Sequence, residues 1–188
     1  MVGFGGKQAW LAVRDGDPAK VLAALGLRDL GEVPWRDGVD LAYLTDDRVV
    51  VTPPLPGVAG TVWVLVAGRW LLRPDTAVDV TGLSGELHTE VQFFATHRVT
   101  ELHRWLRSVA GEPVRAFGYV GQTGEVTSWL GDPDPAELGA GLPAELGEDT
   151  TVLVAEQDVL KVAGAWSIDP TRLDGRPAPG PLRVGAVT

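Results

Sequence analysis

Cysteine is absent from this 188-residue sequence. The absence excludes disulfide bonds, thiolate nucleophiles and thiolate metal ligands. Lysine is also scarce, because only Lys7, Lys20 and Lys161 among the 16 basic residues are lysines. A codon bias toward arginine explains this excess of arginine more simply than arginine-based recognition of a ligand does.

Long apolar runs are missing as well. No stretch reaches the roughly 18 apolar residues that cross a bilayer, and the start MVGFGGKQAW has no basic region followed by an apolar run. We therefore expect a cytoplasmic protein without a membrane segment. The formal charge is −9 and no run of Lys and Arg interrupts it, so nucleic acid is an unfavourable partner. A basic protein partner or a small molecule remains compatible with this charge.

High-specificity catalytic and cofactor motifs are absent. The serine of TGLSGE, residues 81–86, lacks the G-x-S-x-G spacing of a nucleophile elbow. GFGGK, residues 3–7, has no preceding strand to aim a phosphate loop, and we interpret it as a flexible leader. We expect no cofactor, and any function must be inferred from less specific patterns.

Glycine and proline are abundant, at 24 and 14 residues, which suits short strands joined by tight turns better than long helices. We expect one α+β domain over residues 1–175, with a mostly antiparallel meandering β-sheet and helices near both ends of the chain. Residues 176–188 are rich in Pro and Gly, and we expect them to form a flexible tail.

The first half of the chain predicts two short helices between residues 7 and 27, because apolar residues recur there at helical spacing. Asp17 is expected to cap the second helix, with Pro18 at its first position and Gly26 at its end. The next predicted elements are strands in VDLAYL, DRVVVTP and GTVWVLVAG, a hairpin turn at Asp46–Asp47, a short strand in RWLLRP, and a helix or turn in DTAVDVTGLSGEL.

The second half predicts a strand in TEVQFFATH, a helix start in GDPDPAELG, a closing strand in TTVLVA and a C-terminal helix in EQDVLKVAGAWSID. Residues 99–110 fit two structures. Their apolar residues share one face of a helix that Gly111 would end. They also fit a strand followed by a turn at Gly111–Glu112, which would place Trp105 opposite Gly118.

A further pattern favours the strand. It comprises Glu90-Val91-Gln92-Phe93, His97-Arg98, Trp105, Val114-Arg115-Ala116-Phe117, Tyr119, Gly121, Gly124-Glu125, Ala165-Trp166-Ser167 and Asp169-Pro170. Over residues 88–171 the pattern resembles a scattered group of short bacterial proteins without an established activity. The resemblance implies a hairpin, because those proteins carry a turn-forming Asx-Gly pair where Ala110-Gly111 stands here.

One set of polar residues on these predicted strands could carry acid–base chemistry. The set comprises Glu90, His97, His103, Arg115 and Tyr119. A carboxylate can fix a histidine tautomer while an arginine stabilises a developing anion, so we take these five as candidate catalytic residues. A one-residue change in register moves a side chain to the other face of the sheet, and the sequence leaves their convergence open. The structural alternative is that Arg115 pairs with an acid and Tyr119 packs over the sheet.

A metal site would need three or four convergent ligands. The candidates are His88, Glu90, His97 and His103, of which His88 and Glu90 would share a face if both lie on one strand. None of them forms a compact motif. Hydrogen-bonded structural histidines are therefore the simpler interpretation, and no metal is expected.

Seven tryptophans suggest a third kind of site. Trp and Arg dominate binding hot spots, so we take Arg98, Trp105 and Trp129 as candidate binding residues, although most tryptophans on strands belong to a core. In general character, an acidic protein with an aromatic-rich sheet resembles immunity and adaptor proteins that recognise a basic partner. We therefore expect a non-catalytic binding or regulatory protein. A small-molecule enzyme of lyase, cyclase or hydrolase type is the second hypothesis.

Overall fold

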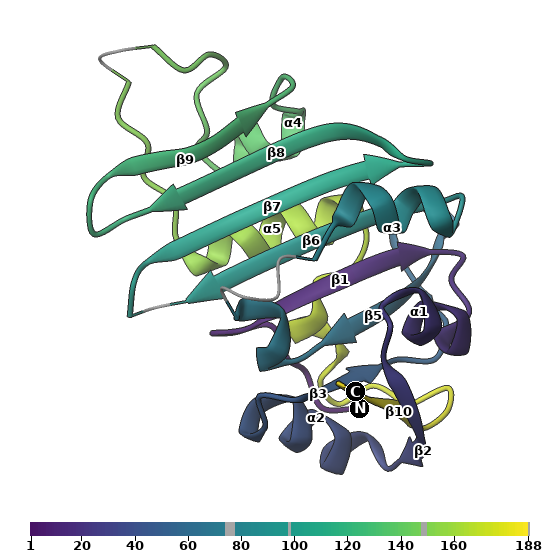
Figure 1. Ribbon diagram of the computed structural model, residues 1–188. Helices are drawn as coiled ribbons and strands as arrows, with labels where there is room; N and C mark the ends of the chain where they lie inside the picture. Colours follow the sequence, from purple (N-terminus) through teal and green to yellow (C-terminus); the bar gives the residue numbers. More distant parts are fainter. Residues whose placement is uncertain (74–77, 98, 148–149, 188) are drawn as a thin grey trace.

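The computed structural model describes residues 1–73, 78–97, 99–147 and 150–187. In this part of the chain, ten strands form one sheet with antiparallel pairings throughout, and five α-helices pack around it (Figure 1). Nine strands follow the order β2-β10-β3-β5-β1-β6-β7-β8-β9, and β4 pairs with β5. The arrangement confirms the predicted α+β fold with a mostly antiparallel sheet.

The strands are β1 (Ala9–Arg14), β2 (Arg28–Val33), β3 (Arg48–Val51), β4 (Leu55–Pro56), β5 (Val62–Ala67), β6 (Glu90–His97), β7 (Leu102–Val109), β8 (Glu112–Val120), β9 (Glu125–Leu130) and β10 (Leu182–Ala186). The α-helices are α1 (Pro18–Ala24), α2 (Trp35–Leu44), α3 (Val80–Glu86), α4 (Pro135–Gly139) and α5 (Glu156–Trp166). Short 3₁₀ helices are η1 (Val58–Gly60), η2 (Arg69–Leu72) and η3 (Pro170–Leu173). Helices α1 and α3 cover one face of the sheet, and α4 and α5 cover the other (Figure 1).

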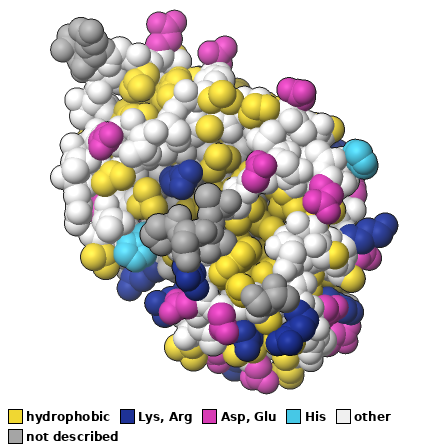
Figure 2. Space-filling view, viewed as in Figure 1, with side chains coloured by type: hydrophobic (Ala, Val, Ile, Leu, Met, Phe, Trp, Pro, Cys, Tyr) yellow, Lys and Arg dark blue, Asp and Glu magenta, His cyan; other side chains and the backbone are white. Residues whose placement is uncertain are grey.

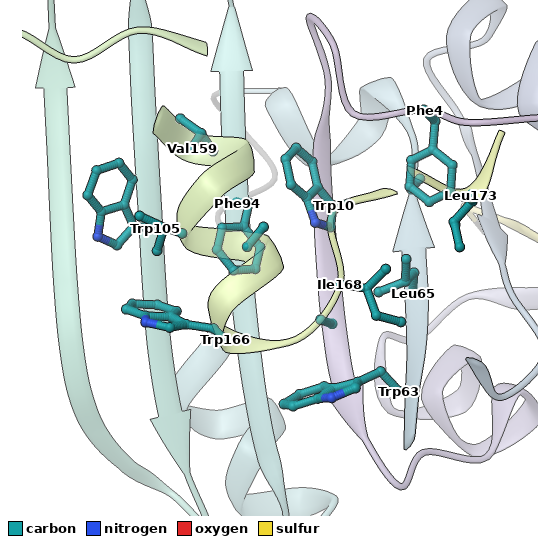
Figure 3. Packing of buried hydrophobic residues seen from close by; sticks show 14 of the residues in the cluster. Phe4, Trp10, Trp63, Leu65, Phe94, Trp105, Val159, Trp166, Ile168 and Leu173 are labelled. Carbon is teal, nitrogen blue, oxygen red and sulfur yellow. The ribbon is translucent and has the colours of Figure 1, made fainter. Parts of the chain in front are cut away.

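The face of the sheet that carries Trp10, Phe94 and Trp105 is called the α5 face (Figure 3). Trp10 and Phe94 are cross-strand partners with ring centroids 5.2 Å apart. Trp105 and Phe117 are partners on β7 and β8, with centroids 4.3 Å apart. Trp166 at the end of α5 packs against Phe94 at 5.9 Å. Such aromatic pairs add about 0.5–1.5 kcal/mol each beyond the burial of their area, so the first two stabilise the sheet and the third holds the end of α5 on it.

The opposite face, called the α3 face, carries alternate residues such as Leu11, Val91 and Phe93. Central strands β1 and β5 are thus buried on both sides, and they form continuous apolar runs instead of an alternating pattern. This explains the first wrong prediction. Trp10, Leu11 and Val13 were expected on a helix because a continuous run also contains helical spacings, whereas they lie on β1.

The segment VDLAYL was wrongly predicted as a strand, since it forms the second half of α2. The buried residues of this helix include Trp35, Val39 and Ala42, whose spacing of four and three positions places them on one face against β3 and β10. Asp46–Asp47 therefore joins a helix to a strand and is no hairpin turn. RWLLRP contains η2 in place of the expected strand, and TTVLVA forms no strand.

Other predicted elements are confirmed. DRVVVTP, GTVWVLVAG and TEVQFFATH contain β3, β5 and β6, and the C-terminal helix is α5. Asp17 caps α1 by accepting a hydrogen bond from the Lys20 amide at 2.9 Å, and Pro18 is the first helical residue. Gly26 follows the helix with a φ of +67°, a conformation that glycine adopts without strain.

The C-terminal segment differs most from the expectation of a flexible tail over residues 176–188. Residues 182–186 form β10, which pairs with β2 on one side and β3 on the other. Leu182 and Ala186 are fully buried and Val184 is buried as well. The glycines and prolines before residue 182 shape the connection into this strand, so composition alone was misleading.

Residues 102–109 form strand β7, which confirms the extended structure over the helical alternative. The two-residue turn is Ala110–Gly111, with φ values of +48° and +91°, and not the predicted Gly111–Glu112. Trp105 therefore lies opposite Phe117 instead of Gly118. A register shift beside Arg107 accommodates the turn close to Pro113, which has no N–H for the ladder.

Candidate functional site

The observed register determines which of the five candidate catalytic residues share a face. Glu90, His103, Arg115 and Tyr119 lie on the α5 face, because their cross-strand partners and alternation place them with Phe94, Trp105 and Phe117. His97 is an odd number of positions from Glu90 on the same strand. It therefore lies on the α3 face.

Two of the five residues line one hollow of about 660 Å³, which we call the acidic hollow. It lies between the N-terminal end of α5 and the adjoining ends of β7 and β8. Its lining comprises Glu101, His103, Tyr119, Gly121, Leu153, Val154, Ala155, Glu156, Gln157 and Asp158. His103 and Tyr119 are direct cross-strand partners, with side chains 5% and 3% exposed. Both side chains therefore line the hollow and are little exposed to bulk solvent.

His103 is held by Thr96, whose Oγ1 lies 3.2 Å from the histidine Nδ1. Burial lowers the pKa of His103, and the nearby carboxylates of Glu156, Glu101 and Asp158 oppose this effect only in part. The imidazole is consequently neutral at pH 7. Within the described residues its Nε2 makes no hydrogen bond, and neither does the Tyr119 hydroxyl. Two largely buried side chains therefore line the hollow with polar atoms that have no protein partner among the described residues.

The carboxylates of the hollow are positioned by the backbone around α5. Glu156 accepts a hydrogen bond from the Lys7 amide at 2.9 Å. Asp158 accepts one from the Ala155 amide at 3.0 Å and also pairs with Lys161 at 2.9 Å. Such acidic residues in the first turn are favourable because they complement the helix dipole. Two carboxylates of the hollow are thus held in place before any ligand arrives.

Glu101 supplies the third carboxylate from the loop between β6 and β7. Its backbone carbonyl accepts a hydrogen bond from the Gly121 amide at 3.0 Å, which ties this loop to the turn between β8 and β9. The side chain of Glu101 is exposed. It is therefore accessible to a ligand, which must displace part of its hydration water on binding.

Arg115 does not reach the acidic hollow. Its Nε donates to Glu137 of α4, at 2.8 Å and 3.1 Å to the two carboxylate oxygens, and both side chains are buried. The guanidinium also donates to the carbonyls of Leu130 and Gly131 and lies 4.4 Å from the ring centroid of Trp129. Arg115 therefore takes the structural role that was the alternative for it.

The candidate binding tryptophans belong to the same buried group. Trp105 is fully buried and its Nε1 donates to Glu137 at 2.5 Å. Trp129 is half-buried between the Arg115 guanidinium and the edge of Phe117. Neither ring forms an exposed binding surface. The third candidate, Arg98, lies outside the described residues.

Glu90 is distant from His103 along the sheet. Glu90 pairs with Val109, whereas His103 pairs with Thr96, six residues further along β6, which corresponds to about 20 Å. The Glu90 carboxylate is buried, forms an ion pair with Arg107 at 2.6 Å and accepts a hydrogen bond from Gln92 at 2.8 Å. The five candidates therefore form no single cluster.

His97 is half-buried on the other face, with its Nδ1 3.1 Å from the Thr100 Oγ1. The suggested pair of His88 and Glu90 on one strand does not form, because His88 precedes β6 and has a φ of +52°. Within the described residues, no three histidine or acidic side chains are grouped as a metal ion would require.

Sequence reasoning missed Glu101, Glu156, Asp158 and Glu137. The position of Asp158 three residues after the N-cap of a predicted helix is a detectable signal. The other three carboxylates reach their positions only through contacts between distant segments, and no local pattern marks them.

No protein-family model, curated protein or solved structure matches this chain. Among the described helices, none combines the length and apolar character that crossing a membrane requires.

Proposed function

We propose that this protein is a non-catalytic binding protein that recognises a positively charged side chain of a protein partner in the acidic hollow. The observation that carries the proposal is the lining itself. Glu101, Glu156 and Asp158 line the same hollow as His103 and Tyr119, whose Nε2 and hydroxyl have no hydrogen-bond partner within the described residues. A guanidinium or ammonium group could donate to both while its charge is balanced by the carboxylates.

The net charge supports a basic partner. A formal charge of −9 steers a cationic partner toward the protein and raises the association rate, while close carboxylates determine which group binds. The original expectation of an aromatic-rich binding surface is not part of the proposal, because Trp105 is buried in the core. The proposal keeps the cytoplasmic location that the sequence suggested.

Calorimetric titration with an acetylated and amidated tri-arginine peptide tests this function. The matched control peptide is tri-citrulline, which has the same shape without the charge. We expect binding of tri-arginine that weakens with added salt, and no binding of tri-citrulline. Equal binding of the two peptides, or no heat with either at millimolar concentration, would contradict the proposal.

Two conservative variants locate the binding. Glu101→Gln should weaken tri-arginine binding up to about fivefold, as expected for an exposed charge pair. Tyr119→Phe removes only the hydroxyl and should weaken it by about two- to tenfold. The matched control is Glu125→Gln on β9, an exposed acidic residue outside the hollow, and it should leave the affinity within twofold.

Acid–base chemistry on a small molecule is the second candidate function. The observation in its favour is that a neutral histidine and a tyrosine hydroxyl are adjacent in one hollow, where His103 could accept a proton and Tyr119 could donate one. The test is mass spectrometry of a cell metabolite extract incubated with the protein. Compounds consumed by the native protein, and not by His103→Gln or Tyr119→Phe, would support catalysis. Identical spectra with all three proteins would exclude it for that extract.

A further inference from the structure

A second hollow lies on the α3 face, opposite the acidic hollow. An apolar hollow of about 290 Å³ is lined by η2, the start of α3 and strands β6 and β7. Its apolar side chains include Leu71, Val80, Phe93 and Leu106. Ligand sites in proteins begin at about 300 Å³, so the volume suits a short chain or a single ring.

Two charged residues, Arg73 and Arg104, belong to this largely apolar lining, and Arg104 is the one that lies on strand β7. Its guanidinium lies 5.9 Å from the ring centroid of Phe93. Burial lowers the pKa of Arg104, although arginine stays protonated in proteins. No acidic side chain pairs with Arg104 within the described residues. Desolvating a half-buried cation that has no counter-ion costs free energy. An anionic ligand would offset this cost by pairing with the cation.

A neighbouring hollow of about 570 Å³ extends the positive charge. It shares Leu72, Arg73 and Leu102 with the apolar hollow. Among its described lining residues, Lys7, Arg69, Arg73 and His97 are basic, and Asp46 is the one carboxylate, paired with Arg69 at 3.1 Å. This concentration of basic residues is unusual in a protein with a formal charge of −9. Figure 2 shows basic side chains beside hydrophobic surface near the centre of this face.

We propose that the apolar hollow binds a small amphipathic carboxylate, with its apolar chain or ring against Phe93, Leu71 and Leu106 and its carboxylate on Arg104. The planar guanidinium can hold a carboxylate through two parallel hydrogen bonds. The neighbouring basic hollow raises the local anion concentration. The site is independent of the proposed partner-binding function, since the two hollows share no lining residue.

Titration with decanoate, followed by ¹H–¹⁵N NMR spectra, tests the proposal. We expect saturable shifts of the amides of Arg104, Phe93 and Leu106, with no shifts at His103 or Tyr119. The neutral analogue decanol should bind at least about tenfold more weakly, because it lacks the charge. Each methylene removed in a series from decanoate to hexanoate should weaken binding about fourfold.

The first variant is Arg104→Met, in which methionine keeps an unbranched apolar side chain and removes the charge. Its matched control is Arg36→Met, at an exposed position of α2 outside both hollows. Arg104→Met should weaken decanoate binding at least about tenfold and Arg36→Met should not change it. The proposal is overturned if decanoate causes no saturable shifts, if decanol binds equally well, or if both variants bind as the native protein does. Thermal unfolding of Arg104→Met, with a midpoint no lower than that of the native protein, shows that the variant is folded.

Discussion

The buried polar residues of the α5 face have different roles, depending on whether another side chain pairs with them. Arg115 and Glu137 form a buried ion pair beneath α4, while His103 and Tyr119 keep polar atoms directed at a hollow. The difference follows from what covers each position. A helix with a carboxylate covers Arg115, whereas the chain around the start of α5 leaves space above His103 and Tyr119.

The first prediction concerns the Arg115–Glu137 pair. Arg115→Met should lower the free energy of unfolding by about 3–5 kcal/mol, because it leaves the Glu137 carboxylate buried without its counter-charge. The double variant Arg115→Met/Glu137→Leu should recover part of this loss. Urea unfolding measures both. The control is Arg172→Met, which removes an exposed guanidinium paired with the partly buried Asp169 and should cost no more than about 1 kcal/mol. A double variant less stable than the single one would contradict this account.

The second prediction concerns His103 and pH. Burial lowers the pKa of His103 below its ordinary value of 6.5, so the unfolded chain binds this proton more readily than the folded protein. The resulting loss of stability is absent well above pH 6.5 and grows as the pH falls below it. His103→Gln should therefore reduce the loss of unfolding free energy between pH 7 and pH 5. If urea unfolding shows equal losses in both proteins, the histidine is not desolvated as described.

At the scale of elements, the sequence predicts strands best where polar turns bound them and least well in the middle of the sheet. β3, β5 and β6 follow from their composition and boundaries, as does α5 from its spacing of apolar residues. β1 was misread because a strand buried on both faces has no alternation. β2 was missed because its side chains are mostly exposed, in an apolar-poor edge strand.

The candidate site depended on one element boundary that the sequence left open. Placing the turn at Ala110–Gly111, together with the bulge beside Arg107, sets His103 opposite Tyr119. The residue pattern itself placed the turn one residue later, at Gly111–Glu112, and nothing in it indicated the bulge. The contact of β7 with α4, which adds Glu137, and that of β6 with α5, which adds Glu156, join segments too distant for a local pattern to reveal.

The third prediction tests the turn. Ala110 has a φ of +48°, a left-handed conformation that Asn tolerates better than Ala, and a glycine follows it as in the favoured Asn-Gly hairpin turns. Ala110→Asn should raise the free energy of unfolding by about 0.5–1 kcal/mol. The same change at Ala19, an exposed position of α1, should lower it by a few tenths to about 0.7 kcal/mol. Equal effects at the two positions, measured by urea unfolding, would contradict the turn geometry.

At the scale of the whole molecule, a strand from the C-terminal segment is inserted between two strands from the N-terminal part of the chain. β10 lies between β2 and β3, so the first fifty residues cannot complete their part of the sheet without residues 182–186. The contact order of this region is correspondingly high. The arrangement also joins the two ends of the chain, because the Met1 carbonyl accepts a hydrogen bond from the Gly175 amide at 3.1 Å.

The fourth prediction is that truncation after Gly180 prevents stable folding. Burial of Leu182 and Val184 alone is worth about 1.5–3 kcal/mol each, and the ladder bonds to β2 and β3 are lost as well. These losses are comparable with the total stability of about 5–15 kcal/mol that native proteins have. Circular dichroism and limited proteolysis should show an unfolded or rapidly digested chain. A truncated protein with native spectra and protease resistance would mean that β10 is dispensable.

The acidic hollow is the feature on which the proposed function depends, and ¹H–¹⁵N NMR with the tri-arginine peptide locates binding directly. The account predicts that the amides of Glu101, His103, Tyr119 and Asp158 shift together with a single affinity, while those of Arg104 and Phe93 stay unchanged. Shifts scattered over the acidic surface, or the absence of any at His103 and Tyr119, would contradict it.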